Sequence, residues 1–157
     1  MAIAHLNIGS NIGDRHALIG QAVAAVERAF SARAVCSRPF ESEPWGFESP
    51  NTFINIGVNI EVGSLAPLHV LRLLRRAERA VDAASHRDSS GAYIDRRIDI
   101  DLIAIDNQVV DTPELTLPHP RMSQREFVLE PMAELMPLWR HPQLGLTPRE
   151  MLQRLKL

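Results

Sequence analysis

The alternation of apolar and polar residues is clearest between residues 53 and 62. Even-numbered positions carry branched apolar side chains, whereas odd-numbered positions are mostly polar or small. A period of two residues is typical of a β-strand with one face in the core. The other face begins with Phe53 and Asn55, which could stack on and hydrogen-bond a flat heterocycle, or could simply lie beneath a covering helix or loop.

Two longer segments repeat their apolar residues at helical spacing. The first follows Asp14, a good N-cap residue, and includes residues 18–30. The second covers Leu65 to about Ala84, and we expect it to begin near Ser64. A capping box, with proline at the first helical position, predicts a last helix from residue 147 onward.

Shorter apolar runs complete a recognisable order of elements. Residues 2–8, 33–42 and 98–105 predict strands, and a brief strand is expected near residues 109–110. The core order is therefore βαββαβ, followed by further helical pieces. This order suits an α+β fold of the ferredoxin-like type, in which an antiparallel four-stranded sheet carries both helices on one face. At 157 residues, the chain is expected to form a single domain, residues 1–157.

The strand expected at residues 98–105 carries two carboxylates, Asp99 and Asp101, whose spacing places them on one face. The alternation assigns two opposite faces, with Ile98, Ile100, Leu102 and Ala104 on one and Asp99, Asp101, Ile103 and Ile105 on the other. The two aspartate Cα atoms would be roughly 6.5 Å apart. Mg²⁺ binds through one or two carboxylates together with substrate phosphates, so the pair could be half of a metal-nucleotide site. A solvated, salt-bridged strand edge would show the same motif.

Composition and charge narrow the chemistry. A net charge of −2 argues against a non-specific nucleic-acid binder, and no apolar run approaches the length of a membrane span. Sixteen of the seventeen basic residues are arginine, and Lys156 does not follow a glycine-rich turn. Phosphate binding must therefore rest on arginine and metal rather than on a phosphate loop. The single cysteine, Cys36, and the lack of a secretory signal favour the cytoplasm, and a monomer is expected.

Several motifs in a fixed order make the chain resemble a known family. They are Ile8-Gly-Ser-Asn-Ile-Gly-Asp-Arg15, Glu43-Pro-Trp-Gly46, Phe53-Ile-Asn55, Arg96-x-x-Asp99-Ile-Asp101-Leu102, Leu117-Pro-His-Pro-Arg121 with Arg125-x-Phe127, and His141-Pro142. Each motif is weak alone, but their order and spacing together are specific. The family that the chain resembles is 6-hydroxymethyl-7,8-dihydropterin pyrophosphokinase of folate biosynthesis.

The resemblance implies an enzyme that transfers the terminal diphosphate of ATP to the hydroxymethyl group of the reduced pterin and releases AMP. It implies two Mg²⁺ ions on Asp99 and Asp101. The implied pterin-binding residues are Ser42, Pro44, Trp45, Phe53, Asn55 and Phe127. The implied ATP-binding residues are Arg75, Glu78, Leu102, Leu115, Thr116 and His119. The implied catalytic residues, which bind phosphate or close a loop, are Arg87, Arg96 and Arg125.

Some of these residues also have plain structural explanations. Arg75, which stands where the family commonly has glutamine, lies three positions before Glu78, and a surface ion pair is the ordinary expectation for that spacing. His119 lies between two prolines and could be structural. It has no metal-ligand spacing to another histidine, so no zinc site is expected.

The chain departs from the family pattern in the segment that precedes Arg96. Tyr93 stands where tryptophan is common, Ile94-Asp95 where Gly-Pro is usual, and Arg87 is a single loop arginine where two are usual. These departures leave open a slow enzyme, a paralogue with an altered substrate, or a catalytically weak family member that binds pterin or nucleotide for regulation. A binding module for RNA or a partner protein on the same fold is a further alternative.

Overall fold

The computed structural model describes residues 2–43, 51–82 and 98–157. The elements follow the chain in the order β1 (Ala2–Ser10), α1 (Arg15–Phe30), β2 (Val35–Cys36), β3 (Phe40–Ser42), β4 (Phe53–Gly63), α2 (Pro67–Val81), β5 (Asp99–Ile105), β6 (Val110–Asp111), β7 (Thr116–Leu117), a 3₁₀ turn η1 (Met122–Gln124), α3 (Glu126–Leu135) and α4 (Pro148–Leu155). None of the helices in these ranges is long and apolar enough to cross a membrane.

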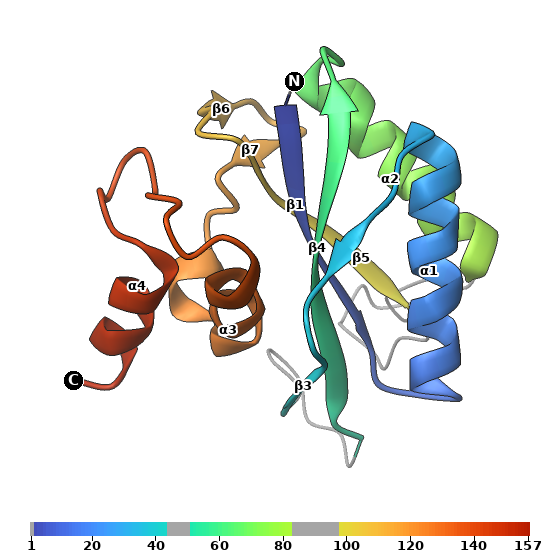
Figure 1. Ribbon diagram of the computed structural model, residues 1–157, viewed down its shortest axis with the longest axis horizontal. Helices are drawn as coiled ribbons and strands as arrows, with labels where there is room; N and C mark the ends of the chain where they lie inside the picture. The colour runs from blue at the N-terminus through green and yellow to red at the C-terminus, as the bar shows by residue number, and fades with distance from the viewer. Residues whose placement is uncertain (1, 44–50, 83–97) are drawn as a thin grey trace.

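The main sheet has the strand order β2-β4-β1-β5, with β3 also paired to β4, and all of these pairs are antiparallel. β2 and β3 together occupy the place of the second predicted strand, so the ferredoxin-like α+β fold is confirmed. Helices α1 and α2 cover one face of the sheet, and α3 lies on the other with α4 outside it (Figure 1). β6 and β7 form a separate two-stranded ribbon.

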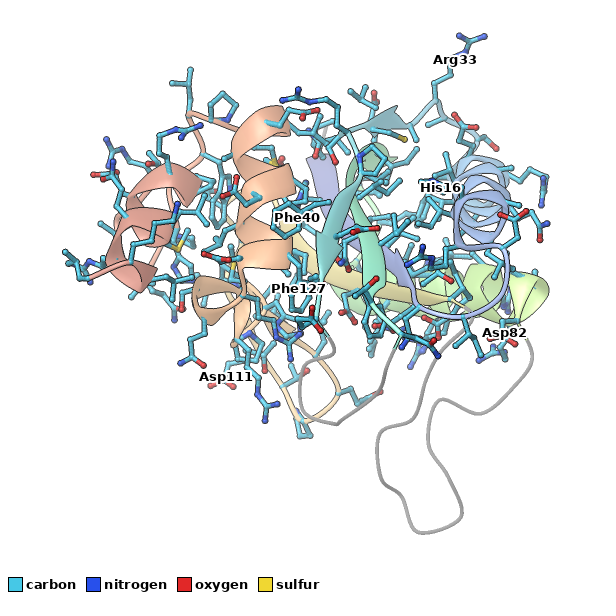
Figure 2. The ribbon with its side chains drawn as sticks, turned by 90° about the horizontal axis from the view of Figure 1, so that it is seen from below. His16, Arg33, Phe40, Asp82, Asp111 and Phe127 are labelled. Atoms are coloured by element: carbon cyan, nitrogen blue, oxygen red, sulfur yellow. The ribbon has the colours of Figure 1, made fainter. Side chains whose placement is uncertain are left out.

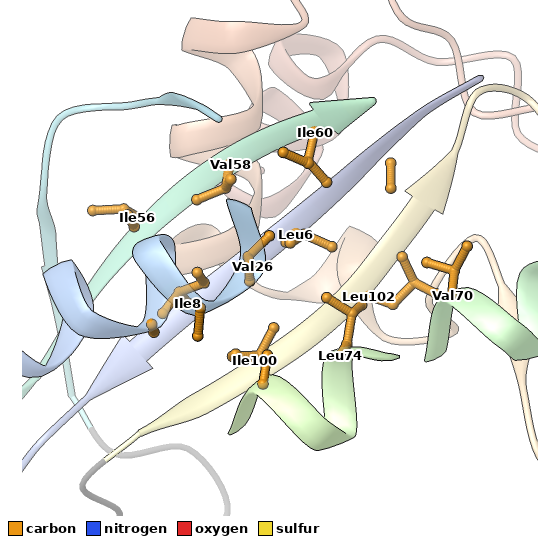
Figure 3. Close-up of a cluster of buried hydrophobic side chains, with 14 of the residues drawn as sticks. Leu6, Ile8, Val26, Ile56, Val58, Ile60, Val70, Leu74, Ile100 and Leu102 are labelled. Atoms are coloured by element: carbon orange, nitrogen blue, oxygen red, sulfur yellow. The ribbon is translucent and has the colours of Figure 1, made fainter. Parts of the chain in front are cut away.

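A first core fills the space between the sheet and the pair α1 and α2 (Figure 3). All five even-numbered apolar residues predicted to face the core from β4 lie in it. The helices contribute their predicted apolar stripes, and Val26, Val70 and Leu74 are fully buried. The apolar residues that recur with a period of two in β4 therefore pack against the apolar stripes of α1 and α2, as the sequence pattern predicts.

A second core lies on the opposite face of the sheet, beneath α3 and α4. Its buried members include Ile103, Met122, Leu129, Met132 and Met151. The loop after α3 is tied to the sheet because the Trp139 indole N–H donates to the Asp106 carbonyl oxygen at 2.7 Å. This layer brings the first turn of α3 over β1 and β4, next to the odd-numbered face of the sheet.

The alternation predicted for the 98–105 strand holds for its first half only. Between the pairs Leu6–Leu102 and His5–Ala104 the register shifts, so Ile103 is the extra residue of a β-bulge. The extra residue reverses the faces beyond it: Ala104 lies in the second core and Ile105 in the first, opposite to the prediction. The positions of Asp99 and Asp101 precede the bulge.

Two predicted boundaries also change. The strand expected over residues 33–42 is broken at Ser37, whose hydroxyl accepts from the Gly57 N–H at 2.8 Å in place of a continuous ladder. Helix α2 begins at Pro67 rather than near Ser64, with proline at a position where its missing N–H costs no hydrogen bond. The Asp14 N-cap is confirmed, as is the capping box at the start of α4.

Candidate active site

Two rows of paired residues cross the odd-numbered face of the sheet. In the first row, Asn55 of β4 pairs with Gly9 of β1, which pairs with Asp99 of β5. The neighbouring row pairs Gly57 with Asn7 and Asn7 with Asp101. The predicted shared face of the two aspartates is therefore confirmed, because the intervening Ile100 is buried in the core on the other side.

Gly9 lets the side chains of β4 lean over the middle strand. A Cβ atom at this position would lie 2.7 Å from Asn55 Oδ1 and 3.5 Å from Cδ1 of Phe53. The first distance is too short for a real contact, so any larger residue would displace the Asn55 amide. Phe53 and Asn55 thus extend over β1 in the row that also contains Asp99.

The Asn55 amide is held in one orientation. Its Nδ2 donates to the hydroxyl oxygen of Ser42 at 2.8 Å, and the Asn55 side chain is almost fully buried. The nitrogen therefore faces β3, and Oδ1 lies on the Gly9 side. An amide oxygen placed in this way can accept a hydrogen bond from the N–H edge of a heterocycle.

The start of α3 forms one wall of a cavity of about 560 Å³. Its lining includes Phe40 and Ser42 from β3, the N-cap residue Arg125 of α3, and Phe127 from the first turn of that helix. Phe40 and Phe127, which share this cavity wall, are labelled near each other in Figure 2. The Arg125 guanidinium carbon lies 5.6 Å from the centre of the Phe127 ring, a cation–π contact. Phe53 and Asn55 do not line this cavity, but the Asn55–Ser42 hydrogen bond places them beside it.

A second cavity, of about 300 Å³, lies beside β5 and is lined both by residues of α2 and by Asp101, which faces the opposite side of the sheet. Asp101 is in its wall, together with five of the six residues assigned to ATP by the resemblance, namely Arg75, Leu102, Leu115, Thr116 and His119. Asp101 therefore lies in the wall of this cavity, whereas Asp99 lies in the row of Asn55, beside the first cavity. Such an arrangement would let two ligands approach the same carboxylates.

The sixth residue, Glu78, has a structural role that corrects the expectation of a surface ion pair. Glu78 Oε2 accepts from the Ile100 N–H at 2.7 Å and from Arg75 at 2.9 Å, and the same Arg75 nitrogen donates to the Ile100 carbonyl oxygen at 2.9 Å. Glu78 is buried. Because β5 is an edge strand, Ile100 turns both backbone groups away from β1, and this pair satisfies them.

His119 is held next to the second cavity by its own backbone. Its N–H donates to the Ile103 carbonyl oxygen at 2.8 Å, and its Nδ1 accepts from the Arg121 N–H at 3.2 Å. Burial, followed by the charges of Arg125 and Arg121, lowers the pKa of His119 to about 4, although the charge of Asp99 acts in the opposite direction. The ring is therefore neutral near pH 7, with its proton on Nε2 because Nδ1 is an acceptor.

The oxygen and nitrogen donors of the site indicate whether it suits Mg²⁺. No group of three or more His, Cys, Asp or Glu side chains gathers in the described ranges. Asp99 and Asp101 are partly exposed on one face, and Asp101 lines the smaller cavity. In nucleotide-dependent enzymes, Mg²⁺ is usually bound by one or two carboxylates, and phosphate oxygens and water complete its coordination. The two aspartates therefore fit the ion.

Four of the expected site residues, Pro44, Trp45, Arg87 and Arg96, lie outside the described residues. Sequence reasoning also missed two residues at the site. Asn7 is buried in the row of Asp101, and Phe40 lines the larger cavity. The signal for Asn7 was present, since His5 and Asn7 are the only polar residues of the apolar strand expected over residues 2–8.

Comparisons with known proteins bear on the whole chain. Residues 5–137 match the family model described as 7,8-dihydro-6-hydroxymethylpterin-pyrophosphokinase. A 2-amino-4-hydroxy-6-hydroxymethyldihydropteridine pyrophosphokinase of Porphyromonas gingivalis is 40% identical over 144 residues, which is 91% of this chain and 96% of the relative. The protein with the same name in Bacillus subtilis is 34% identical, over 85% of this chain and 77% of the relative.

Solved structures agree on the fold. A wild-type Plasmodium falciparum HPPK-DHPS structure with pteroate superposes with a TM-score of 0.74 at 13% identity. The match covers 98% of this chain and 42% of that longer chain. Since the family model spans most of the sequence and the P. gingivalis relative is similar along nearly its full length, this chain belongs to the 7,8-dihydro-6-hydroxymethylpterin pyrophosphokinase family.

Proposed function

We propose that this chain transfers the diphosphate of ATP to the hydroxymethyl oxygen of 6-hydroxymethyl-7,8-dihydropterin and releases AMP, a step of folate biosynthesis. The observation that carries the proposal is the position of Asp99 and Asp101 on one sheet face. Asp101 lines the smaller cavity, and Asp99 shares a row with Asn55, whose amide donates to Ser42 in the wall of the larger cavity. Family membership and the names of the relatives support the reaction. The geometry supports a division of labour between the two cavities.

The pterin is expected beside β3, β4 and the first turn of α3. Phe53 and Phe127 supply aromatic faces on which a flat bicyclic ring can stack. Asn55 offers Oδ1 to the ring edge, while its nitrogen is engaged by Ser42. Pro44 and Trp45 follow Ser42 in the sequence and are assigned to the same pocket by the family resemblance.

ATP is expected in the smaller cavity next to β5. Leu102 and Leu115 offer apolar surface, whereas Thr116, Arg75 and neutral His119 offer polar groups. Glu78 acts on this cavity indirectly, because it holds Arg75 and the Ile100 backbone in place. Asp99 and Asp101 would hold two Mg²⁺ ions. The ions, when bound, would neutralise the phosphate charge that grows during transfer.

The chemistry requires positioning and charge neutralisation rather than a side-chain nucleophile. The substrate hydroxyl attacks the β-phosphorus of ATP, its proton passes to solvent, and the bond to the α-phosphate oxygen breaks to leave AMP. Arg125, next to the pterin cavity, can neutralise a transferring oxygen, and Arg96 and Arg87 are assigned the same kind of role by the resemblance. The alternative of an RNA-binding module is disfavoured, because this sheet face carries two carboxylates that would repel a phosphate backbone.

Product analysis tests the reaction. The protein is incubated with ATP, Mg²⁺ and the reduced pterin, and nucleotides are separated. AMP and pterin diphosphate should appear in equal amounts, and neither should appear without pterin or after chelation of Mg²⁺. Formation of ADP, or pterin-independent AMP, would contradict diphosphoryl transfer. Pterin binding without AMP formation would favour the regulatory alternative.

A further inference from the structure

Helix α3 has a missing backbone hydrogen bond in its first turns. In an α-helix the N–H of each residue donates to the carbonyl oxygen four positions earlier. Residue 131 should therefore donate to the carbonyl of Phe127, but residue 131 is a proline and has no N–H. Inside a helix, a proline ring also crowds the carbonyl group four positions earlier. Phe127 consequently needs a donor from outside the helix.

Asn7 supplies that donor. Its side-chain Nδ2 donates to the Phe127 carbonyl oxygen at 2.8 Å, across 120 positions of the chain. A carbonyl oxygen can only accept, so this contact also fixes which end of the Asn7 amide faces the helix. Asn7 is 3% exposed, and the hydrogen bond is therefore shielded from competing water.

The position of Asn7 links this contact to the site. Asn7 lies in the middle strand, between Gly57 of β4 and Asp101 of β5 in the same row. Pro131 packs on Gly57, where a Cβ atom would lie only 2.9 Å from the proline Cβ. Helix α3 thus contacts the sheet at two points: Pro131 packs against Gly57, and the first turn accepts a hydrogen bond from Asn7.

The first turn is the part of α3 that faces the larger cavity. Arg125 and Phe127 line that cavity and contact each other. We propose that Asn7 is a positioning residue for this reaction: it holds the Phe127 backbone so that the aromatic ring is set for the pterin at a fixed distance from the row of Asp101. The proposal rests on the proposed function, which supplies the pterin as the ligand of this cavity.

A double-mutant cycle tests the proposal. Asn7→Ala removes the donor, and Pro131→Ala restores a helical N–H that can donate to the Phe127 carbonyl. The dissociation constant of the reduced pterin is measured with Mg²⁺ and a non-hydrolysable ATP analogue, and that of the analogue is measured separately. We expect Asn7→Ala to weaken pterin binding about threefold to tenfold, the size of one lost hydrogen bond. Analogue binding should change less than about twofold, an effect below one hydrogen bond.

The Pro131→Ala background gives the decisive comparison. There, Asn7→Ala should weaken pterin binding by less than about twofold, because the helix now satisfies the carbonyl itself. Equal losses in both backgrounds would overturn the proposal, as would equal losses of pterin and analogue affinity, which indicate general damage. Should Asn7→Ala fail to fold, Asn7→Leu fills the same space without a donor and takes its place in the cycle.

A second readout does not depend on the ligand. The N–H groups of Val128 and Leu129 both donate to the Arg125 carbonyl oxygen at 3.0 Å, so their hydrogen exchange reports the first turn of α3. Exchange should be faster in Asn7→Ala and return toward the wild-type rate when Pro131→Ala is added. Unchanged exchange in Asn7→Ala would refute the link to α3. If the wild-type protein does not bind the pterin, the proposed function is refuted. The hydrogen-exchange result would still show whether Asn7 stabilises the first turn of α3.

Discussion

At position 9 the absence of a side chain decides the shape of the site. Gly9 is flanked by Asn55 and Asp99, and a Cβ atom there would meet Asn55 Oδ1 at 2.7 Å. Phe53 Cδ1 would be within ordinary contact distance of the same atom. Because Gly9 has no side chain, the side chains of Phe53 and Asn55 from β4 can extend over β1.

Phe53 should matter for the pterin and not for ATP. In Phe53→Ala, loss of the stacking face should weaken pterin binding about tenfold or more, since an aromatic pair contributes about 1 kcal/mol beyond the area it buries. ATP-analogue affinity should be nearly unchanged, because Phe53 is not in the wall of the second cavity. Isothermal titration of each ligand measures both values. Equal losses for the two ligands would contradict the assignment of Phe53 to the pterin.

His5 should make the protein less stable in mild acid. The ring is fully buried, and burial lowers the pKa of His5 to about 4 although the hydrogen bond with Asn59 acts in the opposite direction. Its folded-state pKa is below the unfolded value of 6.5, so the unfolded state binds more protons between these values. The stability that neutral His5 contributes is present above pH 6.5 and is lost as the pH falls toward 4. The full loss is on the order of 3 kcal/mol.

Urea unfolding between pH 7 and pH 4.5 measures this dependence. The free energy of unfolding should fall with decreasing pH in the wild-type protein. The non-ionisable variant His5→Gln should show a shallower fall over the same range, while His119, whose pKa burial also lowers, continues to contribute. An identical slope in His5→Gln and wild type would show that His5 does not carry this effect.

Single residues differ in how well the sequence predicts them. The shared face of Asp99 and Asp101 follows from local spacing, and the structure confirms it. The burial of Glu78 could not be predicted, because its partner is the backbone of a strand more than twenty positions away. Asn7 was visible as a polar position in an apolar strand, but its function depends on Pro131, which no local pattern connects to it.

Among the elements, α3 depends on a close approach to β4. Pro131 contacts Gly57 so closely that a methyl group on Gly57 would lie 2.9 Å from the proline Cβ and 3.3 Å from its carbonyl carbon. Both neighbours belong to the packed helix, so they cannot swing aside as the end of a flexible side chain would. The seat of α3 on the sheet is therefore set by a glycine.

Gly57→Ala should destabilise the fold by about 1–3 kcal/mol, the usual cost of inserting atoms into a close-packed core. Gly20→Ala is the matched control, because Gly20 lies on the exposed side of α1 with no atom within 4 Å of the added Cβ. The control should stabilise by about 0.5–1 kcal/mol through helix propensity. Urea unfolding of both variants measures the difference. A Gly57→Ala protein as stable as wild type would mean that α3 can move without cost.

Element types were predictable, whereas irregularities within them were not. The βαββαβ order and the faces of α1, α2 and β4 follow from periodicity and are confirmed. The bulge at Ile103 is not, because it arises from the register between two strands and leaves a continuous apolar run in the sequence. The break at Ser37 likewise reflects a side-chain hydrogen bond to another strand.

At the scale of the whole molecule, the two faces of the sheet have different roles: one packs against the main core, and the other carries the candidate site. One face is closed by α1 and α2 over a continuous core, and the other is only partly covered by α3 and α4. Among the residues that the structure describes, α3 and α4 leave one end of that face uncovered, and this end carries Asp99 and Asp101. In the described part of the chain, the sheet therefore offers a rigid surface on which two substrates can meet.

The most direct test of this account is the rate of AMP formation in Asp101→Asn, with Asp111→Asn as the control at an exposed carboxylate on β6. The amide keeps the shape of the side chain but is a poor Mg²⁺ ligand. We predict that Asp101→Asn forms AMP from ATP, Mg²⁺ and the reduced pterin about a hundredfold more slowly, or worse, as expected when charge stabilisation at the transferring phosphate is lost. Its free energy of unfolding should be unreduced, and Asp111→Asn should match the wild type in both measurements. Wild-type turnover in Asp101→Asn would contradict the central claim that this carboxylate organises the reaction.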